Sequence, residues 1–299
     1  MNLYLNSPPV MIVAAARSGT KILRRVLAQS SDFAEFPYDI NFVWKYGNYQ
    51  KQHDELDGDD LTDDIRSFII NQFNKRLRKS SGKRVLEKTV SNSLRVDFLR
   101  AIFPDCKIIY LYRNGYDVAA DARLCWQASA LSARIQPKGD IIKKAINFPF
   151  LAGWPYLRNY FSNYAKRLVL NEQHVRSWGP RFKGIDEAIE KYSLLEVCGM
   201  QWSRSVQLSD ISLSRLKESV DFICVRYEDL VTKPKEELGN IISFLDLSDY
   251  KGILAAGSAN ISDNYVGFAQ QVLTPDDINR LTPHISQSLD LLNYQQLAI

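Results

Sequence analysis

The sequence predicts a single-domain α/β protein whose central parallel β-sheet is flanked by helices. Short apolar runs typical of buried parallel strands recur along the chain, and segments with helical spacing of apolar residues lie between them. Alternation of this kind is typical of a parallel sheet covered by helices on both faces. No repeat or low-complexity linker divides the 299 residues, so we expect one domain over residues 1–299.

The expected strands are the most apolar of these runs. They lie at residues 10–14, 84–88, 106–112 and 221–226. The expected helices carry apolar residues on one face. They lie at residues 21–29, 61–77, 93–102, 118–124, 194–208 and 235–245.

Composition argues against several classes of protein. A net charge of +4 suits a small anionic ligand but is too weak and too dispersed for a nucleic-acid-binding protein. No run approaches the roughly 20 apolar residues of a membrane helix, and the N-terminus lacks the features of a signal peptide. The four cysteines lie far apart, as expected of reduced thiols. We therefore expect a cytoplasmic protein without stable membrane insertion.

The acidic segment 54–64 does not match a calcium loop. An EF-hand needs alternating acidic residues before a glycine and a distant glutamate, and the segment has neither. Acidic residues at the start of the helix that follows complement its dipole instead. We expect no metal site.

The first candidate site follows the first expected strand. Residues 17–21 (Arg-Ser-Gly-Thr-Lys) lie between that strand and a helix, where backbone N–H groups bind phosphate well. The segment differs from a Walker A loop, because Gly19 is followed by threonine rather than lysine and Ala14 stands at the position of the first glycine. It predicts a phosphate site of another kind, and a degenerate P-loop kinase is the alternative.

The second candidate site follows the third expected strand. Arg113 comes directly after this strand, an Asn114-Gly115 turn follows, and the next helix is expected to have Asp117 as its N-cap. An arginine therefore follows each of two buried parallel strands.

Together the two sites resemble those of the PAPS-dependent sulfotransferases. The family's [RK]-[ST]-G-[TS] pattern matches residues 17–20, and its R-[ND]-[PG]-x-x-x-x-x-S motif matches Arg113. The resemblance implies a P-loop NTPase-like sulfotransferase fold. It is closer to the glycan and protein-tyrosine branch of the family than to the small-molecule cytosolic branch.

The resemblance implies that the first motif holds the reactive end of the donor. Arg17, Ser18, Gly19 and Thr20 would wrap the 5′-phosphate and the sulfate of PAPS. Lys21 either adds a charge there or lies on the exposed face of its helix.

The same resemblance implies that Arg113 binds the 3′-phosphate. The family's serine is replaced by Asp121 in this chain, and a carboxylate that faces a phosphate is unfavourable. Either Asp121 turns away from the phosphate, or Arg123 approaches and offsets its charge.

Three weaker matches follow the order that the family has. Residues 87–89 (Glu-Lys-Thr) resemble a segment whose lysine, Lys88 here, approaches the transferring group in several branches. In residues 226–230, Tyr227 would lie near the adenine. Residues 264–267, which end in Gly267, resemble the loop that folds over the nucleotide, although the basic residues that usually follow it are missing.

The resemblance also implies a catalytic base. Small-molecule cytosolic sulfotransferases use a histidine after a Lys-Thr pair, but Val90 stands at that position, and the three histidines lie outside any recognisable motif. Glycan and protein-tyrosine sulfotransferases use a carboxylate beyond the first helix. Glu35 or Asp39 is therefore the predicted base.

The segment 136–184 is predicted to be an aromatic-rich insertion near the acceptor site. Its aromatic rings could stack on sugars or simply pack in the core. The candidates for an acceptor cleft are Trp154, Tyr156, Tyr160 and Trp178. Residues 148–157 could instead touch a membrane surface that carries a lipid-linked acceptor.

The resemblance therefore implies an enzyme that moves a sulfuryl group from PAPS to a hydroxyl or amine acceptor and releases PAP. Arg17 and Lys88 are the expected cations at the sulfate, with Lys21 third. The expected acceptor is a saccharide or another hydroxylated biosynthetic intermediate, either a small molecule, a glycan or a glycolipid. A catalytically inactive PAP-binding protein, suggested by Asp121, is the second alternative, and the oligomeric state is left open.

Overall fold

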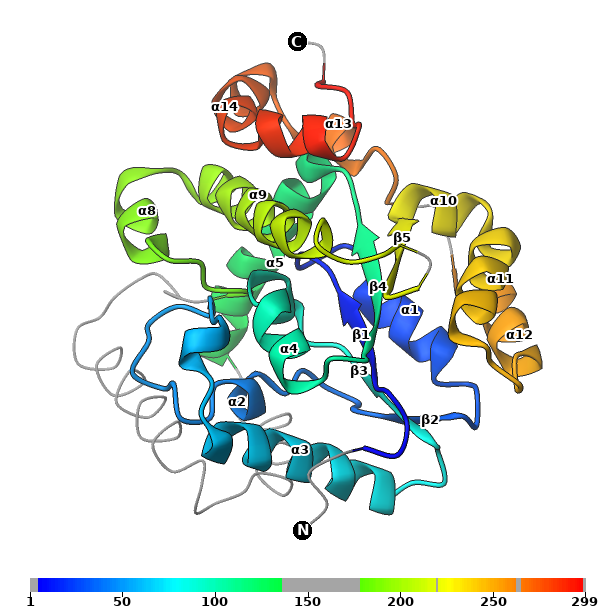
Figure 1. Cartoon of the computed structure of the whole chain (residues 1–299). Coiled ribbons are helices and arrows are strands. Elements are labelled where there is room, and N and C mark those ends of the chain that lie inside the picture. Colours follow the sequence, from blue (N-terminus) through cyan, green and yellow to red (C-terminus); the bar gives the residue numbers. More distant parts are fainter. Residues whose placement is uncertain (1–4, 136–177, 219, 262–264, 298–299) are drawn as a thin grey trace.

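Five parallel strands form one sheet at the centre of the structure (Figure 1). The computed structural model describes residues 5–135, 178–218, 220–261 and 265–297. Within them the strand order is β2-β3-β1-β4-β5, and every neighbouring pair is parallel. The strands are β1 (Val10–Val13), β2 (Phe33–Glu35), β3 (Arg84–Glu87), β4 (Lys107–Tyr112) and β5 (Phe222–Arg226).

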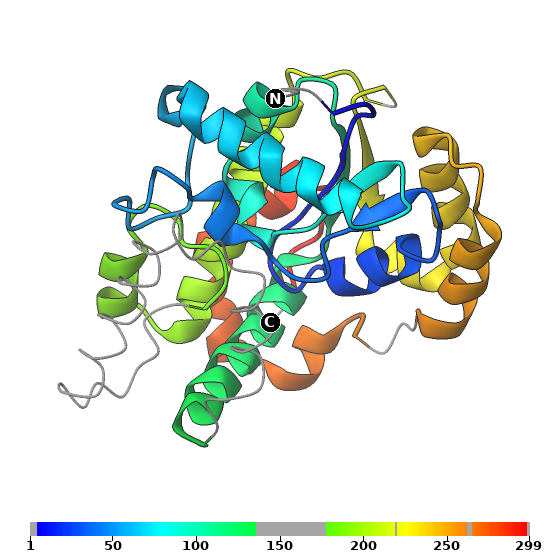
Figure 2. The ribbon, with the colours of Figure 1, turned by 90° about the horizontal axis from the view of Figure 1, so that it is seen from below.

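Helices connect these strands and cover both faces of the sheet (Figures 1 and 2). In the described residues the α-helices are α1 (Thr20–Leu27), α2 (Asn41–Trp44), α3 (Asp63–Arg78), α4 (Val96–Ile102), α5 (Gly115–Ile135), α8 (Ile185–Lys191), α9 (Leu194–Leu213), α10 (Tyr227–Thr232), α11 (Pro234–Leu245), α12 (Lys251–Asn260), α13 (Phe268–Val272) and α14 (Pro275–Leu291). Two 3-10 helices lie at Gly58–Asp60 and Val90–Leu94.

The fold class that the sequence predicts is confirmed. All four expected strands are present, and the expected helices correspond to α1, α3, α4, α5, α9 and α11. The helix expected at residues 93–102 is divided, because a 3-10 helix precedes α4. Strand β2 is missing from the prediction, since its three residues are too few to show a period.

The start of α5 differs from the prediction. The Asn114 side chain caps this helix by accepting a hydrogen bond of 2.9 Å from a backbone N–H in the first turn. Asp117 lies within the first turn, and its carboxylate accepts hydrogen bonds from the backbone N–H groups of Gly267 (3.0 Å) and Ala269 (2.7 Å). The prediction of Asp117 as the cap is therefore wrong. Asparagine and aspartate are equally good caps, and the sequence offers both.

Alternate residues of the central strand β1 face opposite sides of the sheet. Met11 and Val13 belong to a hydrophobic cluster shared with α2, α3 and α4. Val10 and Ile12 belong to a second cluster, shared with α1, α10, α11 and α12. All four side chains are buried, which explains why the strand is a continuous apolar run rather than an alternating one.

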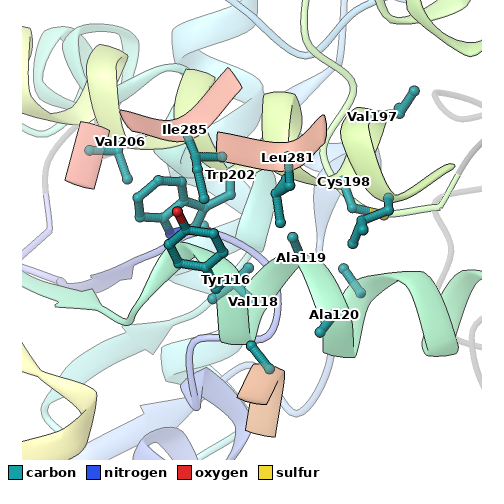
Figure 3. Packing of buried hydrophobic residues seen from close by; sticks show 14 of the residues in the cluster. Tyr116, Val118, Ala119, Ala120, Val197, Cys198, Trp202, Val206, Leu281 and Ile285 are labelled. Atoms are coloured by element: carbon teal, nitrogen blue, oxygen red, sulfur yellow. The ribbon is translucent and has the colours of Figure 1, made fainter. Parts of the chain in front are cut away.

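A third hydrophobic cluster joins α5, α9 and α14 (Figure 3). Tyr116 and Trp202 lie at its centre, and the Tyr116 hydroxyl is hydrogen-bonded to Thr282 at 2.7 Å. Trp202 Nε1 donates a hydrogen bond of 3.2 Å to the carbonyl oxygen of Arg113. A Cβ at Gly115 would lie 2.6 Å from the Trp202 ring, so glycine permits this close contact. The cluster thereby fixes the chain directly after β4.

We expect Trp202→Ala to lower the free energy of unfolding by about 3–5 kcal/mol, because a buried aromatic ring is lost and a cavity remains. Leu124→Ala is the control, since Leu124 lies on α5 but is 44% exposed. It should change the free energy of unfolding by less than about 0.5 kcal/mol. Urea denaturation followed by circular dichroism measures both, and equal losses in the two variants would contradict the role given to Trp202.

Candidate functional site

The candidate site lies at the carboxyl ends of the central strands. Segments 17–21, 88–90, 113–114 and 227–228 follow β1, β3, β4 and β5 respectively. Because these strands are parallel and adjacent, their carboxyl ends meet at one edge of the sheet. Ligands of open α/β sheets bind at this edge.

The loop after β1 has the geometry of an anion site. Gly19 is the N-cap of α1 with φ of 89°, and Arg17 also has a left-handed backbone with φ of 70°. Strained backbone of this kind clusters at functional sites. The Ser18 hydroxyl is buried and has no hydrogen-bond partner among the described residues, and the first N–H groups of α1 begin directly after it.

Gly19 is required by its contact with Tyr227. A Cβ at Gly19 would lie 2.6 Å from Cδ2 of the Tyr227 ring. Only glycine therefore allows both the left-handed backbone and the approach of this ring. Tyr227 was expected near an adenine, and the structure places its ring against the loop after β1.

Arg113 connects three parts of the site. Its Nη1 donates to the carbonyl oxygen of Arg17 at 2.9 Å, and its Nη2 donates to the carbonyl oxygen of Tyr265 at 2.6 Å. The guanidinium lies 4.7 Å from the ring centroid of Tyr227, a cation–π distance. Arg113 is 2% exposed, and its Nε has no partner among the described residues.

Asp121 faces the two arginines of the site. Its Oδ2 lies 3.0 Å from Nε of Arg17 and 3.4 Å from Nη1 of Arg113. Arg123 pairs with Asp277 at 3.4 Å. The structure thus differs from both alternatives of the sequence analysis: Asp121 does not turn away from the site, and its charge is offset by Arg17 and Arg113 rather than by Arg123.

The loop before α13 lies over Arg113. Tyr265 provides the carbonyl that Arg113 binds, and the Gly267 and Ala269 N–H groups bind Asp117 on α5. The structure thus brings Gly267 close to the second motif. Asp117 anchors this loop, a role that no local pattern indicates.

Asp39 and Lys88 form an ion pair that the sequence did not predict. Lys88 Nζ contacts Asp39 Oδ1, and Asp39 Oδ2 accepts a hydrogen bond of 3.4 Å from the N–H of Val90. The Lys88 side chain is 4% exposed, whereas that of Asp39 is 36% exposed. The carboxylate therefore lies at the surface of the site with a buried cation behind it.

Glu35 has a different environment. Its Oε2 accepts a hydrogen bond of 2.6 Å from Arg24 Nη1, which also binds the carbonyl oxygen of Phe36. Glu35 therefore joins the end of β2 to α1. Of the two predicted bases, Asp39 is the one that the structure pairs with Lys88.

The sequence analysis missed Glu87 as a member of the site. This side chain is fully buried and accepts hydrogen bonds from Thr89 Oγ1 (2.5 Å) and Asn92 Nδ2 (2.7 Å). Thr89 Oγ1 in turn accepts from the N–H of Ile40 at 2.9 Å, so the network fixes the residue next to Asp39. Burial raises the pKa of Glu87 to about 7. Its place beside Lys88 in the sequence was the signal that could have identified it.

Two other predicted residues lie at the periphery. Lys21 is exposed on α1, which agrees with the second of its expected positions. Trp178 lies 6.3 Å from Trp126 between ring centroids, and its carbonyl oxygen binds the Gln201 side chain. The remaining aromatic candidates of the insertion, Trp154, Tyr156 and Tyr160, lie outside the described residues.

Glu228, which lies just after β5, binds the turn after β4 and the C-terminal segment. Its Oε1 accepts a hydrogen bond of 3.1 Å from the N–H of Asn114, and its Oε2 accepts one of 2.5 Å from the hydroxyl of Tyr294. Glu228 thereby connects the turn after β4 to the C-terminal segment.

Neither a metal-binding cluster nor a membrane-spanning helix is found in the described part of the chain. It contains no group of three or more His, Cys, Asp or Glu side chains placed to hold a metal ion. None of its helices combines the length and the apolar composition that crossing a membrane requires.

We expect Gly19→Ala to lower the free energy of unfolding by about 1–3 kcal/mol more than Gly184→Ala. Both glycines have a left-handed backbone, so alanine introduces similar strain at each. Only at Gly19 must a neighbouring ring move, because the space around Gly184 is open. Urea denaturation of the two variants measures the difference, and equal losses would show that the Tyr227 contact is not tight.

The comparisons with known proteins agree with this geometry. Residues 8–141 match the model of the sulfotransferase family. The structure is similar to the sulfotransferase domain from the curacin biosynthetic pathway, with a TM-score of 0.58 and 17% identity over 98% of this chain and 100% of that chain. It is also similar to the sulfotransferase domain of the Synechococcus PCC 7002 olefin synthase, with a TM-score of 0.52 and 16% identity over 97% and 96% of the two chains.

A third similar structure is the sulfotransferase from Alicyclobacillus acidocaldarius, with a TM-score of 0.52 and 15% identity over 97% of this chain and 98% of that chain. At these identities the likeness shows the fold. No curated protein matches the sequence. The closer kinship to the glycan and protein-tyrosine branch stays a prediction.

The family match includes Arg17, Arg113, Asp39 and Lys88, the residues around which the site is built. The likeness of fold extends over nearly the whole chain. Residues 8–141 therefore match the sulfotransferase family model, and the fold of the described chain is that of the similar sulfotransferase structures.

Proposed function

We propose that this protein transfers a sulfuryl group from PAPS to a hydroxyl or amine acceptor and releases PAP. The main support for the proposal is that the loop after β1 and Arg113, which follows β4, lie in contact. Arg113 binds the backbone of Arg17 directly, so the two motifs that the sequence assigns to the two ends of the donor form one site. The family match over residues 8–141 supports the same activity.

The residues present fit an anionic nucleotide in most respects. Ser18 Oγ and Arg113 Nε are buried polar atoms without a partner in the described residues, and buried polar groups normally have one. Gly19 keeps the loop free of a side chain. In the proposal Ser18, Gly19 and Thr20 hold the 5′-phosphosulfate, and Arg113 holds the 3′-phosphate.

Asp39 and Lys88 are the proposed catalytic pair. Sulfuryl transfer passes through a loose transition state, as phosphoryl transfer does, so positioning and charge stabilisation dominate. Asp39 accepts the proton of the acceptor hydroxyl, whose oxygen forms the new bond to sulfur. The bond from sulfur to the bridging oxygen breaks, and PAP leaves with its electron pair. Lys88 and Arg17 supply the positive charge that stabilises the negative charge developing on the leaving group.

The acceptor in this proposal is a saccharide or another hydroxylated biosynthetic intermediate, including glycolipids. The aromatic-rich segment 136–184 is its proposed binding region. The reaction is proposed to take place in the cytoplasm without a metal ion and without nucleic acid as a partner.

Binding of PAP tests the donor class. We expect calorimetric titration to show binding of PAP without Mg²⁺, and Arg113→Ala to weaken it by about 100-fold. The loop after β1 loses its hydrogen bond from Arg113, and the carboxylates of Asp117 and Asp121 lose that cation. Arg215→Ala is the control, since Arg215 is exposed and pairs with Asp97 away from the site. It should leave the affinity unchanged.

Titration with ATP separates the proposal from the kinase alternative. Tighter binding of Mg·ATP than of PAP would contradict the proposal and favour a degenerate P-loop kinase. Binding of PAP without any sulfate transfer to a broad set of acceptors would favour the inactive nucleotide-binding protein.

The rate of sulfuryl transfer in variants of Asp39 and Glu35 tests which carboxylate is the catalytic base. We expect Asp39→Asn to reduce the rate of transfer from radiolabelled PAPS by about 10²–10⁴-fold, the usual contribution of a general base, with little change in PAP affinity. Glu35→Gln should retain most activity, because Glu35 pairs with Arg24 rather than with Lys88. A panel of saccharides and glycolipids serves as acceptor. Full activity in both variants would show that neither carboxylate is the base.

A further inference from the structure

The Asp121 carboxylate lies between arginines that follow two different strands. Its Oδ2 is 3.0 Å from Arg17 Nε and 3.4 Å from Arg113 Nη1. The side chains of Asp121 and Arg113 are 9% and 2% exposed. Water and salt therefore screen these charges far less than they screen a surface pair.

The positive charge of the two arginines is already balanced within the protein. In addition to Asp121, the Asp117 carboxylate lies 3.8 Å from Arg113 Nη2. Two backbone carbonyls also accept hydrogen bonds from the Arg113 guanidinium. Two arginines and two aspartates give this cluster a formal net charge of zero.

A phosphate that enters such a cluster meets no excess positive charge. An uncharged side chain at position 121 would leave a net charge of +1, and the arginines would be free to form charge-assisted hydrogen bonds to the phosphate. We infer that Asp121 is a resident counter-anion that a nucleotide phosphate must displace from Arg17 and Arg113. It thereby sets how strongly the site distinguishes nucleotides with and without a phosphate at this position. The inference rests on the proposed nucleotide donor.

Asp121 also explains how the arginines can stay together when no phosphate is bound. Arg17 has a left-handed backbone, and Arg113 binds its carbonyl oxygen. Without a carboxylate between them, the two guanidinium groups would repel each other. The same carboxylate therefore organises the empty site and lowers the affinity for the phosphorylated product, which favours its release.

Calorimetric titration with PAP and with 5′-AMP tests this inference, because the two nucleotides differ only in the 3′-phosphate. We expect the unmodified protein to bind PAP less than about tenfold more tightly than 5′-AMP, since the added phosphate meets a neutral cluster. Asp121→Asn should raise this ratio by about tenfold or more, because one negative charge is removed beside the phosphate. Asp277→Asn removes a carboxylate that pairs with Arg123 instead, and it should leave the ratio unchanged.

Two further measurements test the inference even if one variant fails. Asp121→Ser provides a second uncharged side chain if Asp121→Asn does not fold. The ratio of PAP affinity to 5′-AMP affinity can also be measured in the unmodified protein, without any variant. A ratio above about 100 in the unmodified protein, or weaker PAP binding in a folded Asp121 variant, would overturn the inference and leave the proposed donor intact. No PAP binding by the unmodified protein or by either variant would overturn the proposed donor and this inference with it.

Discussion

The buried guanidinium of Arg113 is the interaction on which the rest of the site depends. It binds the carbonyl oxygens of Arg17 and Tyr265 and packs on the Tyr227 ring, so one side chain joins the ends of three strands and the loop before α13. A cation this deeply buried is stable only when its donors are satisfied and its charge is matched. Asp121 provides the nearest matching charge, which links the position of the arginine to the electrostatics of the ligand site.

Much of the fold could be predicted from the sequence, because its strands are buried on both faces. The continuous apolar runs that became β1, β3, β4 and β5 carry this signal directly. The short edge strand β2 carries none, since three residues show no period. The assignment of residues 1–299 to one domain stays a prediction, because residues 136–177 lie outside the described part of the chain.

Several residues of the candidate site could be predicted from the sequence, but their pairings could not. Local motifs indicated Arg17, Arg113 and Lys88, because each follows a strand in a recognisable turn. The partners of these residues come from other parts of the chain, and no spacing encodes them. Lys88 meets Asp39 across 49 positions, and Arg113 meets Tyr265 across 152. Such contacts are set by the strand order and by side-chain packing, which a single sequence does not display.

These partners lie far apart in the sequence, so a shortened chain would lose part of the candidate site. Tyr227 and Tyr265 lie beyond the family-matched residues 8–141, yet one packs on Gly19 and the other holds Arg113. Closing loops of this length costs conformational entropy that only the assembled sheet and its helices offset. A chain shortened to residue 141 would therefore keep both recognisable motifs and still lack the partners that complete the candidate site. The motifs are local in the sequence, but the candidate site takes residues from Arg17 to Tyr265.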